Sequence, residues 1–237
     1  MIPVSHSAWS CFSGEAPAEV DLAATASSVA DDIDLAPATT ASDDEPTEAS
    51  ATGIEGTWTI DTSVGEFTVA DATTATFVGF RVEEVLNSIG STTAVGRTPD
   101  VRGSTTIEGT TLMSAEIKAE LTSIVSDEPR REDSIQDALN TASNPTATFV
   151  LTEPIDLGTG AAEGEAIAVT ATGELTINGV TNEVEIELDA RLIDGTILVT
   201  GATDIAFADY DITVPTALMV LSVEDNGTIE IQLWLSR

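Results

Sequence analysis

The sequence predicts an all-β fold, and three observations support this prediction. Apolar and polar residues alternate with a period of two in several segments after residue 54. Dipeptides that contain glycine and favour tight turns separate these segments. A single segment of this region, Glu132 to Asn140, has the pattern of a short helix. Many strands with one apolar face each favour a closed antiparallel barrel or a sandwich of two sheets.

The alternation is clearest in four segments. Residues 113–121 (MSAEIKAEL) place Met113, Ile117 and Leu121 on one face and charged side chains on the other. Residues 165–177, 184–192 and 228–236 follow the same pattern. One apolar and one polar face is typical of antiparallel strands that are buried on one side only.

Four dipeptides predict the turns that join these strands. Asparagine followed by glycine is the strong signal for a two-residue hairpin, and Glu-Gly and Asp-Gly pairs are weaker signals. Four such hairpins imply about eight strands. The dipeptides are Asn178-Gly179, Asn226-Gly227, Glu108-Gly109 and Asp194-Gly195.

The net charge limits the partners of the protein. The chain has 41 Asp and Glu against 8 Lys and Arg, which gives a formal charge of -33. A surface this negative repels phosphate backbones, so we predict no nucleic-acid partner. Lys118 is the one lysine of the chain. An acidic surface with so few lysines keeps a protein soluble in strong salt, which predicts a halophilic or marine origin.

Composition divides the chain near residue 54. Residues 1–54 contain ten acidic residues and no Lys or Arg, in a background of Ala, Thr, Ser and Pro. We predict a disordered acidic tail or tether over residues 1–54 and a β-barrel domain over residues 55–237. The longest apolar stretch, from Ile212 to Val223, is shorter than the ~20 residues that a membrane-spanning helix needs. The first residues lack the pattern of a signal peptide, and we interpret Cys11 as a free tail cysteine.

Histidine and cysteine are too rare for most catalytic sites. His6 and Cys11 each occur once, and both precede the predicted domain. Ser-His-Asp, Cys-His and HExxH sites are therefore excluded, and we predict a non-catalytic protein without a metal or a cofactor. Arg130 and Arg131 are compatible with an anion site, but the adjacent carboxylates favour a salt bridge within the loop.

The lumen of the predicted barrel leaves two interpretations open. A barrel of about eight strands has an interior that side chains either fill or leave open for one small ligand. Small side chains on the predicted inward faces are consistent with an apolar cavity for a hydrocarbon, and equally with a narrow and fully packed core. These residues are Ala115, Ala119, Ala171, Gly173 and Ala190.

Three sequence strings resemble those of a known family. They are Trp-x-Ile-Asp at residues 58–61, Pro-x-Ala-x-Phe at residues 145–149, and Gly-x-Leu-Thr-Ile-x-Gly-Val-Thr at residues 173–181. In this order the strings resemble the bacterial YceI-like family, and the resemblance covers residues 55–237.

The resemblance implies a lipocalin-like antiparallel β-barrel of about eight strands with one short helix. It further implies that the lumen binds an isoprenoid lipid, such as the tail of an isoprenoid quinone, in an extracytoplasmic protein. Residues 8–22 (AWSCFSGEAPAEVDL) resemble the segment that follows a membrane anchor in family members. A missing N-terminal anchor would then be the only link to a membrane. A homodimer stays open, as does a packed barrel that serves adhesion or assembly without a ligand.

Strand alternation and motif position together select the side chains expected to contact the isoprenoid. The hydroxyl of Tyr210 is expected at the barrel mouth, where it would hold a polar headgroup. For every other residue of the set, the alternative role is plain barrel core. The apolar set is Val78, Phe80, Val82, Met113, Ile117, Leu121, Phe149, Leu151, Leu175, Ile186, Leu188 and Phe207.

The charge of the chain predicts how its stability responds to salt. Added NaCl screens the mutual repulsion of the acidic side chains, so the melting temperature is expected to rise from low to molar salt. Thermal unfolding followed by circular dichroism at increasing NaCl measures this response. A flat or falling melting temperature would contradict the halophilic interpretation.

Overall fold

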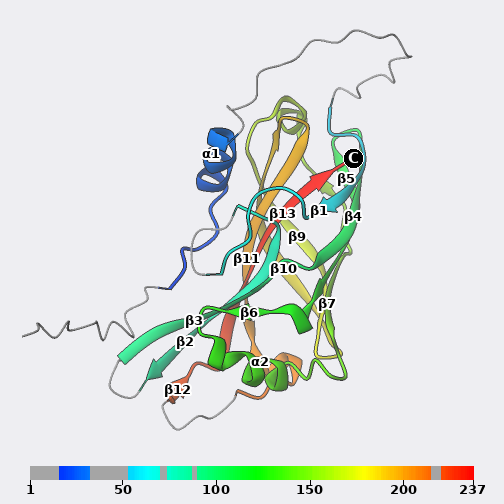
Figure 1. Cartoon of the computed structure of the whole chain (residues 1–237). Helices are drawn as coiled ribbons and strands as arrows, with labels where there is room; N and C mark the ends of the chain where they lie inside the picture. Colours follow the sequence, from blue (N-terminus) through cyan, green and yellow to red (C-terminus); the bar gives the residue numbers. More distant parts are fainter. Residues whose placement is uncertain (1–15, 33–52, 70–73, 87–89, 215–219) are drawn as a thin grey trace, which may run out of the picture.

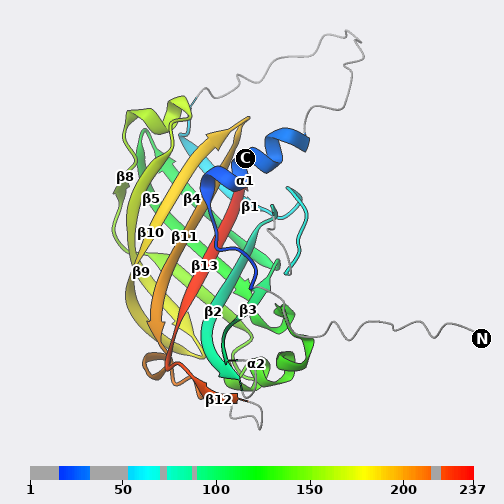
Figure 2. The same cartoon turned by 90° about the vertical axis from the view of Figure 1, so that its left-hand side faces the viewer.

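Eight of the described strands close into an antiparallel barrel. The computed structural model describes residues 16–32, 53–69, 74–86, 90–214 and 220–237. The barrel closes where β1 pairs with β13, so the predicted closed barrel is confirmed and the sandwich is not formed (Figures 1 and 2). In order around the barrel the strands are β1 (Gly56–Asp61), β4 (Val101–Glu108), β5 (Thr111–Glu120), β7 (Thr146–Leu151), β9 (Ile167–Ile177), β10 (Val180–Ile193), β11 (Thr196–Ala206) and β13 (Asn226–Ser236).

Tight turns set the register of the long hairpins. Asn178 and Gly179 have φ values of 51° and 78°, and Asp194 and Gly195 have φ values of 48° and 86°. Two consecutive positive φ angles match the twist of the flanking strands, and Asn, Asp and Gly adopt them at low cost. The predicted hairpins β9–β10 and β10–β11 are therefore confirmed.

The sheet branches at β13. The C-terminal end of β13 pairs with β1, whereas its N-terminal half pairs with β2 (Phe77–Leu86). β2 continues the sheet through β3 (Gly90–Thr98) to the short β6 (Val125–Ser126), and β12 (Val220–Val223) pairs with the far end of β2. These strands extend beyond one end of the barrel (Figure 1).

A short helix, α2 (Glu132–Ala138), lies at this end of the barrel, which we call the α2 end (Figures 1 and 2). It confirms the helix predicted from Glu132 to Asn140. Short 3-10 turns and one further short strand complete the connections. They are η1 (Leu121–Ser123), η2 (Pro129–Arg131), η3 (Thr159–Glu163), η4 (Phe207–Tyr210) and β8 (Ile155–Asp156).

One predicted turn is wrong. Asn226 and Gly227 lie within β13, opposite Ala206 and Ile205, rather than in a hairpin. A Cβ atom at Gly227 would lie 3.1 Å from the ring of Phe207. The glycine thus makes room for an aromatic ring, a role that glycine often has inside a strand.

A β-bulge reverses the predicted orientation of Met113. In the β4–β5 pair, Thr106 lies opposite Ser114 and Ile107 opposite Leu112, so Met113 is the extra residue. Its side chain is 42% exposed, and Leu112 points inward in its place. The placement of Met113 inside the lumen was therefore wrong.

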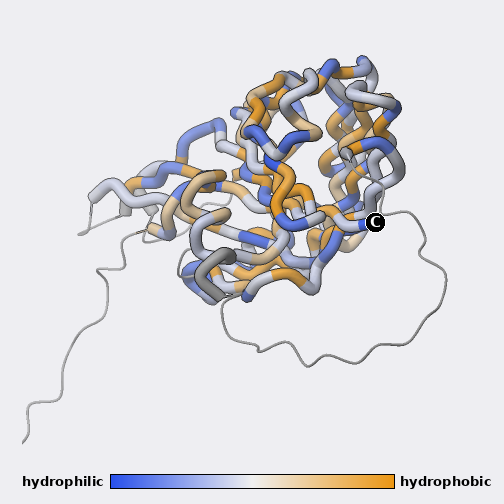
Figure 3. The backbone as a smooth tube through the Cα atoms, turned by 90° about the horizontal axis from the view of Figure 1, so that it is seen from above, coloured by the Kyte–Doolittle hydropathy of each residue, from blue (hydrophilic) through white to orange (hydrophobic). Residues whose placement is uncertain are grey.

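Two apolar clusters occupy the barrel interior. The cluster near β1, the β1 end of the barrel, is built around Trp58, whose Nε1 donates a hydrogen bond to the carbonyl of Ile54 at 2.8 Å. The cluster at the α2 end contains Leu175, Ile177 and Ile205. Hydrophobic and hydrophilic residues alternate along the strands around the barrel (Figure 3), as the period of two predicts.

The described N-terminal segment, residues 16–32, differs from the predicted disordered tail. It contains α1 (Leu22–Asp32), which lies outside the barrel (Figure 2). Ala26 packs with Leu198 and Trp234 of the outer barrel face, which are 0% and 1% exposed. Leu22, Thr25 and Ala26 lie at helical spacing on the face of α1 that contacts the barrel, and the acidic composition of the segment concealed this signal. His6 and Cys11 lie outside the described residues.

A buried ion-pair network fixes the start of this segment on the barrel. Glu230 of β13 is 1% exposed, and its Oε1 lies 2.6 Å from Nε of Arg81. Its Oε2 lies 3.5 Å from Nη2 of Arg97. The two arginines donate hydrogen bonds to the backbone carbonyls of Pro17 and Ala18. Burial lowers the pKa of Arg97, and the charge of Glu230 opposes this shift.

No described helix is both long and apolar enough to span a membrane.

The packing of α1 can be tested with Ala26→Asp. An unpaired carboxylate would be buried against Trp234, so the free energy of unfolding is expected to fall by about 1–3 kcal/mol. Urea unfolding followed by tryptophan fluorescence measures this change. The exposed neighbour Ser27→Asp is the control and is expected to stay within about 0.5 kcal/mol of the wild type. Equal effects of the two substitutions would contradict the packing of α1.

Candidate ligand-binding cavity

A cavity of about 420 Å³ lies in the barrel at the α2 end. Its volume falls within the ~300–1,000 Å³ of typical ligand sites. Side chains of β2, β3, α2, β7, β9, β11 and β13 contribute to its wall. The cavity therefore lies where the branch of the sheet and α2 meet.

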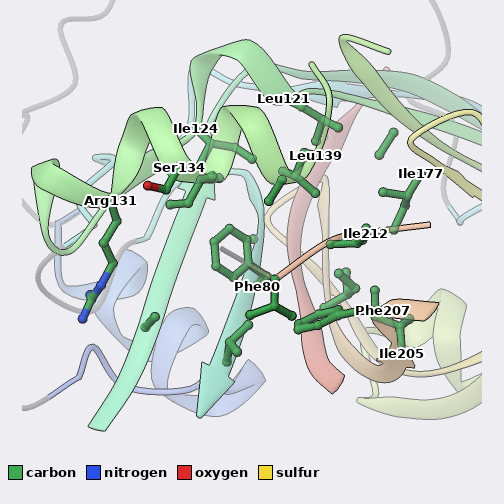
Figure 4. Close-up of a pocket in the computed structure, with 18 of the residues that line it drawn as sticks. Phe80, Leu121, Ile124, Arg131, Ser134, Leu139, Ile177, Ile205, Phe207 and Ile212 are labelled. Atoms are coloured by element: carbon green, nitrogen blue, oxygen red, sulfur yellow. The ribbon is translucent and has the colours of Figure 1, made fainter. Parts of the chain in front are cut away.

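Phe80 of β2 stands at the centre of one wall, and its ring points toward α2 (Figure 4). A Cβ atom at Gly96 of the neighbouring strand would lie 2.5 Å from this ring, so only glycine fits beneath it. Leu121, Ile124 and Leu139 face the ring from the α2 side. These residues form an apolar half-shell.

The other wall comes from the strands that follow α2. Leu175 and Ile177 of β9 and Ile205 of β11 line it, together with Phe207 of η4 and Ile212 (Figure 4). Leu175, Ile177 and Ile205 are almost fully buried. Such a surface favours the hydrocarbon part of a ligand because it offers no hydrogen-bond partner.

Charged side chains gather on one side of the cavity, beside η2. Arg131 forms ion pairs with Glu84 and with Asp127, whose Oδ1 lies 3.0 Å from its Nη1. Burial raises the pKa of Glu84, and the nearby positive charge of Arg131 opposes this rise. Arg130 is 83% exposed, and its Nε lies 4.0 Å from Oε1 of Glu128. The predicted loop salt bridge is confirmed for Arg131, although its partners are not the adjacent carboxylates.

Among the described residues, these ion pairs leave no surplus positive charge at the cavity. Two arginines stand beside three carboxylates, which are Glu84, Asp127 and Glu128. An anionic ligand group would compete with these carboxylates for the arginines, whereas an uncharged polar group would not. The electrostatics therefore favour a neutral or weakly polar headgroup.

The structure brings six of the thirteen predicted site residues to the cavity. Residues that line it are Val78, Phe80, Val82, Leu121, Leu175 and Phe207. Leu188 instead lines a second cavity of about 80 Å³ at the β1 end. Ile117 packs against the cluster at the β1 end, and Phe149 against the cluster at the α2 end. Ile186 is buried and Leu151 is half-buried, but neither lines either cavity.

Tyr210 does not reach the cavity. Its side chain is 2% exposed within the α2-end cluster, and burial raises the pKa of its hydroxyl. The side chains of Asn178 and Asn182 hold the carbonyls of Tyr210 and Asp209, at 3.1 and 2.6 Å. This tight turn keeps Tyr210 inside the protein, so its predicted place at the mouth was wrong.

Sequence reasoning missed the contribution of α2. Ile135, Ala138 and Leu139 line the cavity. Their spacing of three and four residues is the signal of an amphipathic helix, which identifies one apolar face. The helix was predicted, but its apolar face was not assigned to the lumen.

Comparisons with known proteins agree with this geometry. The model of the YceI-like domain family matches residues 58–235. The chain belongs to the YceI-like family. A polyisoprenoid-binding domain from Saccharophagus degradans has a similar structure, with a TM-score of 0.58, 19% identity, and 76% of this chain and 97% of that chain covered. BcnA from Burkholderia cenocepacia gives a TM-score of 0.50 and 18% identity over 67% of this chain and 95% of that chain. No curated protein matches this YceI-like chain.

The raised pKa of Glu84 predicts a pH dependence of stability. A carboxyl whose pKa is higher in the folded state than its usual 4.5 stabilises the fold most in its protonated form, and this contribution is lost as the pH rises. The free energy of unfolding of the wild type is therefore expected to fall, relative to Glu84→Gln, as the pH rises from the usual carboxyl pKa of 4.5 towards neutral. Urea unfolding of both proteins across this range measures the difference.

The exposed neighbour Glu83→Gln controls for the loss of one negative charge on β2. A constant offset between wild type and Glu84→Gln would show only the loss of the ion pair with Arg131. A difference that grows with pH in favour of the wild type would contradict the raised pKa.

Proposed function

We propose that this protein binds a long apolar isoprenoid lipid, such as the tail of an isoprenoid quinone, without catalysing a reaction on it. The observation that carries the proposal is the apolar cavity of about 420 Å³ inside the barrel. A carrier needs such a space, whereas an adhesion or assembly module with a packed barrel does not. The cavity therefore favours the carrier over this alternative.

The family supports the same ligand class. A structure with the same fold is described as a polyisoprenoid-binding domain. At 19% identity the likeness concerns the fold, so the ligand is inferred from this fold together with the apolar wall around Phe80 and Leu175.

Burial of hydrocarbon supplies enough free energy for the proposed binding. Each buried methylene contributes about 0.8 kcal/mol, so a few isoprene units outweigh the cost of association and give roughly micromolar affinity. The polar headgroup would lie beside Arg131 and Ser134, on the charged side of the cavity (Figure 4). The ion pairs there favour an uncharged group such as a quinone ring.

The proposal includes an extracytoplasmic location, with a membrane link only through an N-terminal anchor. This part rests on the family resemblance of the N-terminal segment. Fractionation of cells that express the natural gene, followed by detection of the protein outside the cytoplasm, tests the location.

Homodimer formation is tested by sedimentation of the purified protein.

Filling the cavity tests the binding proposal. Ala147 lines the cavity from β7, so Ala147→Phe is expected to displace ligand and to weaken binding at least about tenfold. The same change at Ala168, which points outward from β9, is the matched control and is expected to leave binding unchanged. Native mass spectrometry of protein purified under mild conditions detects the bound lipid. Absence of any isoprenoid on the wild type, or equal occupancy of both variants, would contradict the proposal.

A further inference from the structure

The lumen is divided into two spaces rather than one tunnel. The larger cavity of about 420 Å³ lies at the α2 end and the smaller one of about 80 Å³ at the β1 end. Among the described residues, none lines both cavities. A layer of side chains that line neither cavity lies between them, as the positions along β9 show.

The register of β9 locates this layer. Val169 lines the small cavity and Leu175 lines the large one, while Ala171 and Gly173 lie between them on the same inward face. These two residues line neither cavity. The dividing layer crosses the barrel at their level.

Phe149 is the aromatic residue of this layer. On β7 it pairs with Leu175 of β9, and its ring lies over Gly173. A Cβ atom at Gly173 would lie 2.5 Å from Cζ of Phe149, so the ring occupies the space that another side chain would take. On its other side Phe149 faces Ile117 of β5. Ile186 of β10 is buried at the same level.

We infer that the layer around Phe149 forms the floor of the large cavity and thereby sets the length of prenyl chain that the barrel encloses. Phe149 itself lies behind the side chains that line the cavity, packed against the cluster of Leu175. The inference rests on the proposed function and deepens it. A group of the size of a water molecule takes up about 30 Å³. A cavity of about 420 Å³ thus encloses roughly 14 such groups, which corresponds to about three five-carbon isoprene units. The isoprene units that exceed this number cannot pass the floor and remain at the mouth of the cavity.

This geometry predicts how affinity depends on chain length. Affinity rises with each isoprene unit that enters the cavity, because each unit removes apolar surface from water. It levels off once the cavity is full, because further units gain no buried contact. The transition is expected near fifteen carbons, that is, about three units.

The experiment compares geraniol, farnesol and geranylgeraniol, which contain two, three and four isoprene units. Each prenol competes with a fluorescent dye that brightens in apolar surroundings. For the wild type, farnesol is expected to bind at least about tenfold more tightly than geraniol, and geranylgeraniol within about threefold of farnesol.

Removal of the ring tests the role of Phe149. Phe149→Ala is expected to connect the two cavities and to raise the affinity for geranylgeraniol relative to farnesol at least about fivefold over the wild-type ratio. Comparing ratios between proteins cancels the different behaviour of the prenols in solution. Phe149→Leu, a milder change, is expected to shift the ratio in the same direction and covers the case in which the alanine variant does not fold.

Leu198→Ala is the matched control. Leu198 is fully buried on the outer face of the barrel beneath α1, so its truncation also destabilises the protein but leaves the lumen unchanged. Its prenol ratio is expected to equal that of the wild type.

The outcomes separate the two proposals. If no prenol displaces the dye from the wild type, the proposed function fails. If prenols bind but wild-type affinity still rises at least about tenfold from farnesol to geranylgeraniol, the floor is not at Phe149. An unchanged ratio in the folded Phe149 variants would overturn the inference in the same way, while the proposed function would stand.

Discussion

The structure depends on the two successive pairings that β13 makes along one edge. Its C-terminal end closes the barrel with β1, and its N-terminal half instead carries β2 and the strands beyond it. The barrel is therefore closed around the cluster of Trp58 at the β1 end, where only a small cavity of about 80 Å³ is found among the described residues. At the other end the sheet widens, and α2 covers the opening. One strand thus produces both a stable core and an enclosed space.

Aromatic rings placed over glycines shape this space. Phe80 lies over Gly96, and Phe149 lies over Gly173. Phe, Trp and Tyr make up only 4% of the chain, so each ring inside the barrel affects the shape of the lumen strongly. A ring beside a glycine fills the width of two side-chain positions while the strands keep their pairing. Small residues on the inward faces thus produce a packed layer in one place and a cavity in another.

Sequence periodicity predicted the strands, the helical pattern predicted α2, and the Asn-Gly and Asp-Gly dipeptides predicted the long hairpins, because these features depend on neighbours close in the chain. The errors arose where distant parts of the fold decide the outcome. Met113 points outward because it is the extra residue of a β-bulge, which depends on the pairing with β4. Gly227 does not form a turn and instead leaves space for the ring of Phe207. Periodicity placed Phe149 correctly inside the barrel, but only the register between strands shows that it separates two cavities. Tyr210 was misplaced because two asparagine side chains hold its turn.

The attachment of Pro17 and Ala18 to the arginines of β2 and β3 limits how far the barrel can move from the start of the chain. A free tail of 54 residues would extend to about 190 Å, whereas the contacts of Pro17 and Ala18 hold the chain on the barrel well before residue 54. The acidic residues 33–52 add nothing to this distance, because the chain on both sides of them is held on the barrel. Any link to the chain before Ala16 would therefore reach the barrel through Pro17 and Ala18, and residues 18–54 would not lengthen it.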